Sequence, residues 1–68
     1  MERLVVGVEG MHCDGCVRNI TGVLKALPGV GQVEVSLDAK QATIDFDSTQ
    51  VGLPQFKDAI EGAGFDVV

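Results

Sequence analysis

Residues 30–47, VGQVEVSLDAKQATIDFD, contain two short runs in which apolar and polar side chains alternate. The first run covers residues 30–37 and the second covers residues 41–47, with the short segment 38–40 between them. Alternation with a period of two is typical of a β-strand that has one buried face. Two such runs joined by a short turn predict a β-hairpin.

The segments that flank this hairpin repeat their apolar side chains at helical spacing. In residues 16–27 the apolar positions recur three or four residues apart, and Pro28 followed by Gly29 ends the pattern. Gly52 and Pro54 mark the start of a second helix, which glycines stop at its far end. The predicted buried face of the first helix is Val17, Ile20, Leu24 and Leu27. The predicted buried face of the second is Leu53, Phe56, Ile60 and Ala63.

Two further strand patterns complete the chain. Residues 2–8 are rich in β-branched side chains, and residues 65–68 leave room for a short last strand. This order predicts one α+β domain, residues 1–68, of the ferredoxin-like βαββαβ type, with a four-stranded antiparallel sheet and two helices on one face. We also expect the strands that a helix connects to pair in parallel through right-handed crossovers.

The charge balance is acidic: ten acidic and five basic side chains give a formal net charge of −5 over 68 residues. An acidic surface repels phosphate groups, so nucleic acids and anionic membranes are disfavoured as partners. It suits a basic protein partner or cations, and simple solubility explains it equally well. No apolar run approaches the roughly 20 residues that span a bilayer, and the residues after Met1 lack the apolar stretch of a signal peptide. We therefore expect a cytoplasmic protein.

The unusual chemistry of this chain lies in residues 10–16, GMHCDGC. Cys13 and Cys16 are separated by two residues where the loop meets the first helix, so their sulfur atoms can turn toward one point. The positive end of the helix dipole stabilises a thiolate, above all at Cys16. A thiolate pair selects soft cations, and Cu(I) is satisfied by two sulfur ligands, whereas zinc usually takes four. The pair therefore predicts a Cu(I) site from which the metal can pass to an incoming thiolate.

A C-x-x-C pair alone is not specific, because it also occurs in thiol–disulfide oxidoreductases and in zinc half-sites. An oxidoreductase is disfavoured here, since the chain is short for a thioredoxin-like domain and has no aromatic residue beside Cys13. Pro28 and Pro54 also lie at helix ends rather than opposite the motif. A structural domain with vestigial cysteines stays open. No Ser–His–acid set and no phosphate-binding loop is visible in the sequence, so we do not expect an enzyme.

Residues 11–16, MHCDGC, match the M-x-C-x-x-C signature of the heavy-metal-associated domain family. The chain resembles that family from end to end, including residues 26–30, 33–37 and 59–65. The family includes cytosolic copper chaperones and the N-terminal domains of copper-transporting P-type ATPases.

This resemblance implies a role for several residues of the motif and for one residue outside it. Cys13 and Cys16 would bind the metal, and Met11 would be a buried residue that supports the loop. Phe65 would pack near the metal, at a position where copper chaperones often have Lys or Tyr and ATPase domains often have Phe. We expect the side chain of His12 to be exposed, and a role as third ligand is the alternative.

The same resemblance implies a copper chaperone that delivers Cu(I) to a copper-transporting P-type ATPase or to a copper-responsive regulator. Apart from the resemblance, the acidic side chain of Asp14 suits the start of the first helix, and Gly15, which has no side chain, would leave space for the sulfur of an incoming partner. The alternatives are a metal-binding domain of such an ATPase and a relative that is specific for Hg(II), Cd(II) or Zn(II). We expect a monomer and leave a metal-bridged dimer open.

Overall fold

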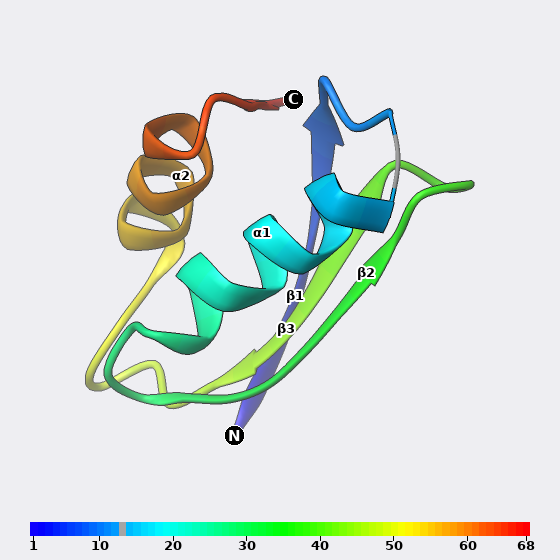
Figure 1. The fold of residues 1–68 in the computed structure, drawn as a ribbon. Coiled ribbons are helices and arrows are strands. Elements are labelled where there is room, and N and C mark those ends of the chain that lie inside the picture. Colours follow the sequence, from blue (N-terminus) through cyan, green and yellow to red (C-terminus); the bar gives the residue numbers. More distant parts are fainter. Residues whose placement is uncertain (13) are drawn as a thin grey trace.

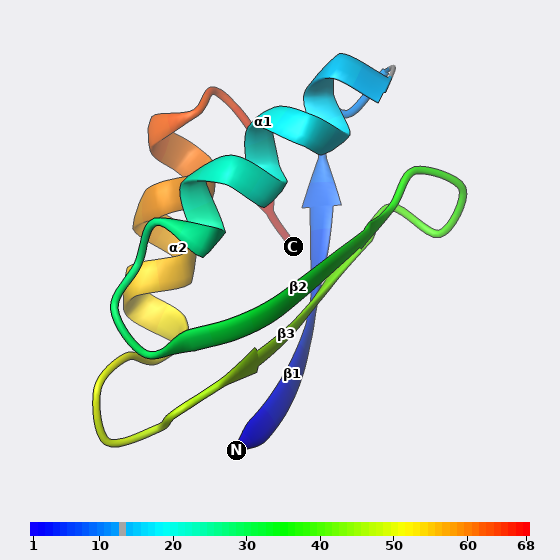
Figure 2. The same cartoon turned by 60° about the horizontal axis from the view of Figure 1, so that its bottom comes forward.

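The computed structural model describes residues 1–12 and 14–68 of the chain. The helices and strands in this part are β1 (Glu2–Glu9), α1 (Asp14–Lys25), β2 (Val30–Ser36), β3 (Gln41–Phe46), α2 (Leu53–Gly62) and β4 (Asp66–Val67). This order confirms the predicted βαββαβ arrangement. Figures 1 and 2 show a two-layer structure in which both helices cover the same face of the sheet.

The sheet has the strand order β2-β3-β1-β4, and each pair of neighbours is antiparallel, as the α+β ferredoxin-like prediction required. The expectation that helix-connected strands pair in parallel is wrong. Strand β3 lies between β1 and β2, and β1 lies between β3 and β4. The short turn after β2 places β3 beside it, and β3 then pairs with β1. Each helical crossover therefore spans one intervening strand.

The β2–β3 hairpin follows the alternation that the sequence shows. Ala42, Ile44 and Phe46 of β3 are buried, and the residues between them face outward in part. The register shifts by one residue near the start of β2, where Val30 pairs with Phe46 and Gln32 pairs with Asp45. The extra residue makes a β-bulge, a feature that increases the local twist of a strand.

The two helices bury one face each, and the prediction for the second helix contains one error. In α1, Ile20 and Leu24 are fully buried, while Val17 and Leu27 are partly buried against the core. In α2, Phe56 and Ile60 are fully buried, and Ala63 packs against the core beyond the helix end. Leu53, however, is 47% exposed.

Leu53 is the first residue of α2, and the buried residues of this helix begin at Phe56. Val51 is buried in its place, two residues earlier in the chain. The amide group of Gly52 donates to Oε1 of Gln55 at 2.9 Å, which satisfies one backbone group near the helix start.

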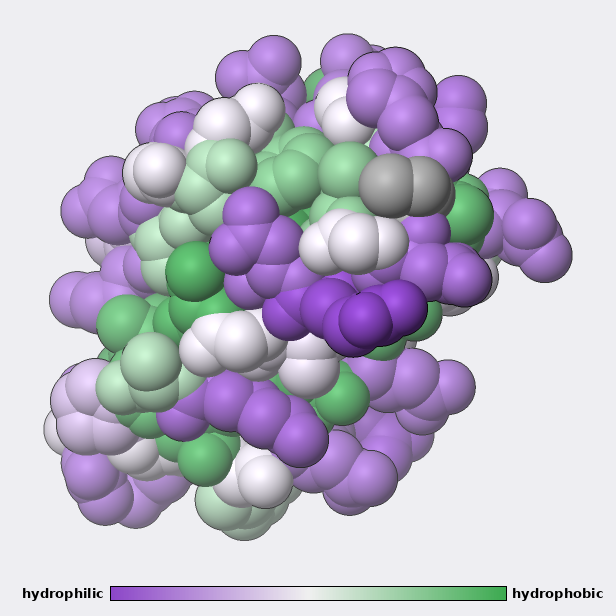
Figure 3. Space-filling view, viewed as in Figure 1, coloured by the Kyte–Doolittle hydropathy of each residue, from purple (hydrophilic) through white to green (hydrophobic). Residues whose placement is uncertain are grey.

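A single apolar core lies between the sheet and the helices. Among the described residues its buried members are Val6, Val8, Met11, Ile20, Leu24, Ala42, Ile44, Phe46, Val51, Phe56, Ile60 and Phe65. The rings of Phe46 and Phe56 meet edge to face, with centroids 5.0 Å apart and an interplanar angle of 79°, and so tie β3 to α2. On the face drawn in Figure 3, hydrophilic side chains make up much of the outline and hydrophobic ones show between them.

Candidate metal-binding loop

The candidate loop connects the end of β1 to the start of α1, at one end of the molecule (Figure 1). Gly10 begins it with a backbone φ of +98°, a conformation that residues with a β-carbon rarely adopt. A β-carbon at this position would lie 3.4 Å from Cδ1 of Phe65. The loop therefore turns sharply at Gly10 and passes close to the segment that precedes β4.

Met11 is buried in the core, 7% exposed, as the family resemblance implies. Phe65 is buried in the same core at 9%, and its amide group donates to the carbonyl of Ile60 at 3.2 Å. The side chains of Met11 and Phe65 therefore pack the loop against the core. Burial of a Met or Phe side chain stabilises a fold by about 1.5–3 kcal/mol, so the loop is attached to the core rather than lying loosely over it.

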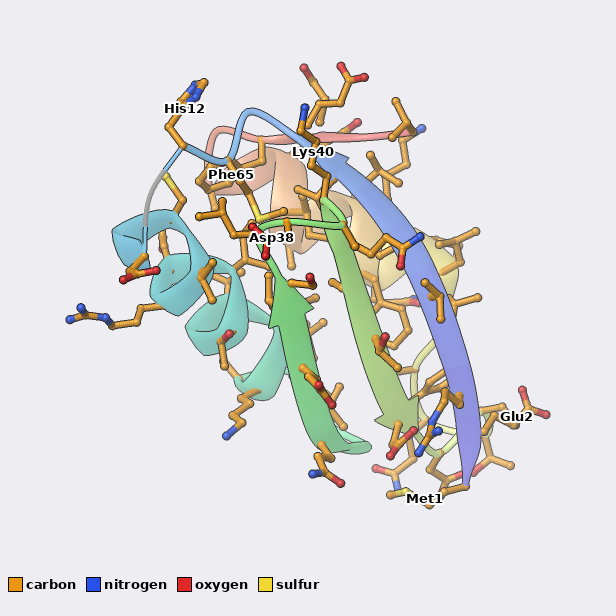
Figure 4. All side chains as sticks on the ribbon, turned by 90° about the vertical axis from the view of Figure 1, so that its right-hand side faces the viewer. Met1, Glu2, His12, Asp38, Lys40 and Phe65 are labelled. Carbon is orange, nitrogen blue, oxygen red and sulfur yellow. The ribbon has the colours of Figure 1, made fainter. Side chains whose placement is uncertain are left out.

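His12 is exposed, which confirms the prediction for its side chain. Figure 4 shows its ring projecting outward at the end of the molecule, with Phe65 below it and Lys40 nearby in the same view. Its neighbour Met11 points into the core, so the two adjacent side chains lie on opposite sides of the loop.

The structure describes one of the two predicted metal ligands, Cys16. Cys13 lies outside the described residues, so its predicted ligand role stays a prediction. Cys16 lies in the first turn of α1, which begins at Asp14 as predicted, and its side chain is partly buried against the core. Within residues 1–12 and 14–68, no group of three or more His, Cys, Asp or Glu side chains is placed to hold a metal ion.

A hollow of about 350 Å³ lies beside the loop, lined by Glu9, Gly10, Met11, His12 and Lys40. Lys40 comes from the turn between β2 and β3, and no local pattern in the sequence predicts its place beside the loop. The signal was present in the topology: β3 runs antiparallel to β1 and begins where β1 ends, with Gln41 opposite Gly7. The hairpin turn must therefore lie next to the loop.

The described groups with shifted pKa values lie at the opposite end of β1 from this loop. Nε of Arg3 donates to Oδ1 of Asp45 at 2.9 Å, and this bond raises the pKa of Arg3 and lowers the pKa of Asp45. Hydrogen bonds from Thr49 and Gln50 lower the pKa of Asp47. These contacts are not part of the candidate site.

The charges at the loop end include a pair of carboxylates. Glu9 and Asp66 lie directly opposite each other in the β1–β4 pairing. Like charges in such cross-strand positions repel.

No helix in the described part of the chain is long and apolar enough to cross a membrane.

Comparison with known proteins places this arrangement in a family. The model of the heavy-metal-associated domain matches residues 5–66. The chain is 47% identical over 62 residues to the copper chaperone CopZ of Staphylococcus saprophyticus, a match that covers 91% of each chain. Among solved structures it is similar to the CopZ metallochaperone, with a TM-score of 0.97, 36% identity and coverage of 98% of this chain and 100% of that one.

A second similar solved structure is one domain of a larger protein. It is a copper-binding domain from HMA7, a P-type ATPase, with a TM-score of 0.96, 34% identity and coverage of 100% of this chain and 92% of that one. The fold, the M-x-C-x-x-C motif at the strand-to-helix junction and the family match agree. The chain belongs to the heavy-metal-associated domain family.

Proposed function

We propose that this protein is a cytoplasmic copper chaperone, a carrier rather than an enzyme, which holds Cu(I) between the thiolates of Cys13 and Cys16. It would deliver the ion to a copper-transporting P-type ATPase or to a copper-responsive regulator. The observation that carries this proposal is the match to CopZ over 91% of both chains, together with the position of Cys16 in the first turn of α1.

The chemistry of the donor set fits Cu(I). Two thiolates are soft ligands, and Cu(I) accepts a near-linear pair, whereas zinc usually takes four ligands. Cys16 would supply one sulfur from the first turn of α1. Cys13 would supply the other from the loop. His12, Asp14 and Gly15 are exposed, so a partner can reach this part of the surface.

Delivery would proceed by ligand exchange. A thiolate of the partner adds to the copper as a third ligand, one thiolate of this protein then leaves, and a second partner thiolate completes the transfer. The ion changes ligands without entering water as a free ion. Met11 and Phe65 hold the loop against the core during this exchange and take no part in binding the metal.

The kinetics of transfer test this proposal. The Cu(I)-loaded protein is mixed without oxygen with the reduced, metal-free metal-binding domain of a copper-transporting P-type ATPase, and copper in each partner is followed with time. Ligand exchange requires a rate that rises in proportion to the acceptor concentration. A rate that does not depend on the acceptor would mean that copper is first released, and would overturn the chaperone mechanism.

A second candidate is a metal-binding domain of a P-type ATPase. The likeness to the HMA7 domain favours it, and the family resemblance stated above implies the same for Phe65. The metal chemistry would be the same, and copper would pass to a transport site of the same protein. The size of the native gene product in a cell lysate separates the two. A product the size of this chain supports the separate carrier, and a much larger one supports the ATPase domain.

A further inference from the structure

Strand β2 forms an open edge of the sheet, because the strand order β2-β3-β1-β4 gives it one neighbour. Among the described residues, no helix or strand runs alongside β2 on the side that faces away from β3 (Figures 1 and 2). The opposite edge is β4, which has two residues, whereas β2 has seven. An open edge presents backbone N–H and C=O groups with which a further strand can pair.

The hydrogen bonds of β3 determine which backbone groups of β2 face the open side. The amide group of Val8 donates to the carbonyl of Lys40 at 2.8 Å, so the backbone of Lys40 is directed toward β1. In antiparallel strands, residues that bond to one neighbouring strand alternate with residues that bond to the other. Ala42 and Ile44 of β3 therefore bond toward β1, and Thr43 between them bonds toward β2.

The same alternation continues into β2. Glu34 lies opposite Thr43, so the backbone groups of Glu34 bond to β3. Its neighbours Val33 and Val35 direct their N–H and C=O groups the other way, to the open side. The side chains of Val33 and Val35 are half-buried against the core. The open side of β2 thus combines backbone donors and acceptors with β-branched side chains, which suits it to pairing with another strand.

This edge carries little of the protection that sheet edges usually have, which is lysine, proline, a bulge or an inward-pointing charge. The sequence of β2 contains neither lysine nor proline, and its β-bulge lies at its start, between Val30 and Gln32. The one charged side chain of β2 is Glu34, which lies with Gln32 on the outer face of the sheet, beside a shallow hollow. We therefore examine which pairing Glu34 permits.

We propose that β2 is a self-association surface, at which two copies of this chain pair their β2 strands antiparallel about a two-fold axis. Glu34 selects the register, because a pairing that set the two Glu34 carboxylates opposite each other would be unfavourable. With Val33 opposite Val33 of the second copy, Glu34 lies opposite Gln32. The amide group of Gln32 can donate to that carboxylate, and the two-fold symmetry forms this contact twice.

We expect this dimer to be weak. One strand edge covers a narrow strip of the molecule, less than the roughly 1,200 Å² that a stable interface buries. The net charge of −5 on each copy also opposes association. The dissociation constant should be on the order of 0.1–1 mM, so that the dilute protein is a monomer. The contact needs neither a metal nor the cysteines, and in this it differs from a metal-bridged dimer.

Sedimentation equilibrium and amide NMR spectra of the reduced protein, with a metal chelator present, test this proposal at concentrations up to about 1 mM. The Cys13→Ser/Cys16→Ser variant is measured in parallel, so that neither a disulfide nor a bridging metal can join the copies. We expect both proteins to associate alike, with the amide signals of Val33 and Val35 shifting as the concentration rises. A protein that stays monomeric at about 1 mM, or signals of Val33 and Val35 that do not shift, would overturn the proposal.

Charge substitutions at Gln32 test the register. Gln32→Lys sets an ammonium group opposite Glu34 of the second copy and should tighten association about two- to tenfold, since the pair occurs twice in the dimer. Gln32→Glu should weaken association by a similar factor. Gln41→Lys is the matched control for the change in net charge, because Gln41 is exposed on β3, one strand away from the edge. Circular dichroism checks that each variant is folded.

The gain from Gln32→Lys should disappear when Glu34 is also replaced by Gln, because the ion pair can then no longer form. An equal gain from Gln41→Lys would show that net charge alone is responsible. That result, or a gain from Gln32→Lys that persists beside Glu34→Gln, would overturn the register and with it this pairing of β2.

Discussion

The ring of Phe65 lies against Gly10, so that a β-carbon added to Gly10 would be 3.4 Å from Cδ1 of that ring. The start of the candidate metal-binding loop is thus packed on the last loop before β4. The backbone φ of +98° at Gly10 makes the same position unfavourable for any residue with a side chain.

Gly10→Ala should lower the free energy of unfolding by more than about 1 kcal/mol, because alanine does not suit a positive φ. Gly22→Ala is the matched control. Gly22 lies within α1, and nothing would come within 4 Å of its added β-carbon. That change should raise the free energy of unfolding by about 0.5–1 kcal/mol. Urea denaturation followed by circular dichroism measures both, and equal effects would contradict the account of Gly10.

The contact between Phe46 and Phe56 should contribute far more to the free energy of unfolding than the exposed Leu53 at the start of α2 does. Phe56→Leu removes the edge-to-face contact and leaves a small cavity, so we expect a loss of about 1–2 kcal/mol in the free energy of unfolding. Leu53→Ala should cost less than about 1 kcal/mol, since Leu53 is 47% exposed. If Leu53→Ala proved as costly as Phe56→Leu, the assignment of the buried face of α2 would be wrong.

The facing carboxylates of Glu9 and Asp66 should cost stability. Asp66→Asn removes the repulsion and should raise the free energy of unfolding by a few tenths of a kcal/mol, about 0.2–1 kcal/mol at most. Because salt screens exposed charges, the gain should shrink at about 1 M NaCl. Asp58→Asn on α2 serves as the control. A gain from Asp66→Asn that does not depend on salt would argue against a repulsive pair.

The pKa of Asp47 is lowered because its carboxylate accepts hydrogen bonds from the hydroxyl group of Thr49 at 2.7 Å and from the amide group of Thr49 at 3.0 Å. A carboxyl whose pKa is lower in the folded protein stabilises the fold above its unfolded pKa of about 3.9. This contribution is lost as the pH falls through the folded pKa. Asp47→Asn should therefore lower stability at pH 7, with the difference from wild type disappearing below about pH 4.

Thermal unfolding of wild type and Asp47→Asn between pH 2.5 and pH 7 measures this difference. If the difference in stability between wild type and Asp47→Asn stayed constant from pH 2.5 to pH 7, the charge of Asp47 would not be its cause.

Much of the fold was predictable because the relevant signals are local. The alternation in residues 30–47 and the helical spacing of Ile20 and Leu24 each specify one buried face, and both faces are found in the core. The prediction that Leu53 is buried was wrong, because periodicity alone does not show which turn of a helix is the first to pack on the core. The predicted parallel pairing of helix-connected strands was wrong. This pairing depends on where the β2–β3 hairpin joins the sheet, and no single segment of the sequence determines that position.

The candidate site was predictable in part for the same reason. The spacing of Cys13 and Cys16 is read directly from the sequence, and the burial of Met11 was implied by the family resemblance. The structure confirms that Met11 is buried and that its neighbour His12 is exposed. Lys40 could not be found in this way, since it lies far along the chain and reaches the loop only through the antiparallel pairing of β1 with β3. The ligand roles of the cysteines await a measurement with metal.

That measurement is an anaerobic titration of the reduced protein with Cu(I) in competition with a coloured Cu(I) chelator. The Cys13→Ser/Cys16→Ser variant serves as the control, and parallel titrations use Zn(II) and Hg(II). The account predicts that the wild-type protein withdraws about one Cu(I) per chain from the chelator and that the variant withdraws none. Failure of the wild-type protein to compete for Cu(I), or equal competition by the variant, would contradict the assignment of this protein as a copper carrier.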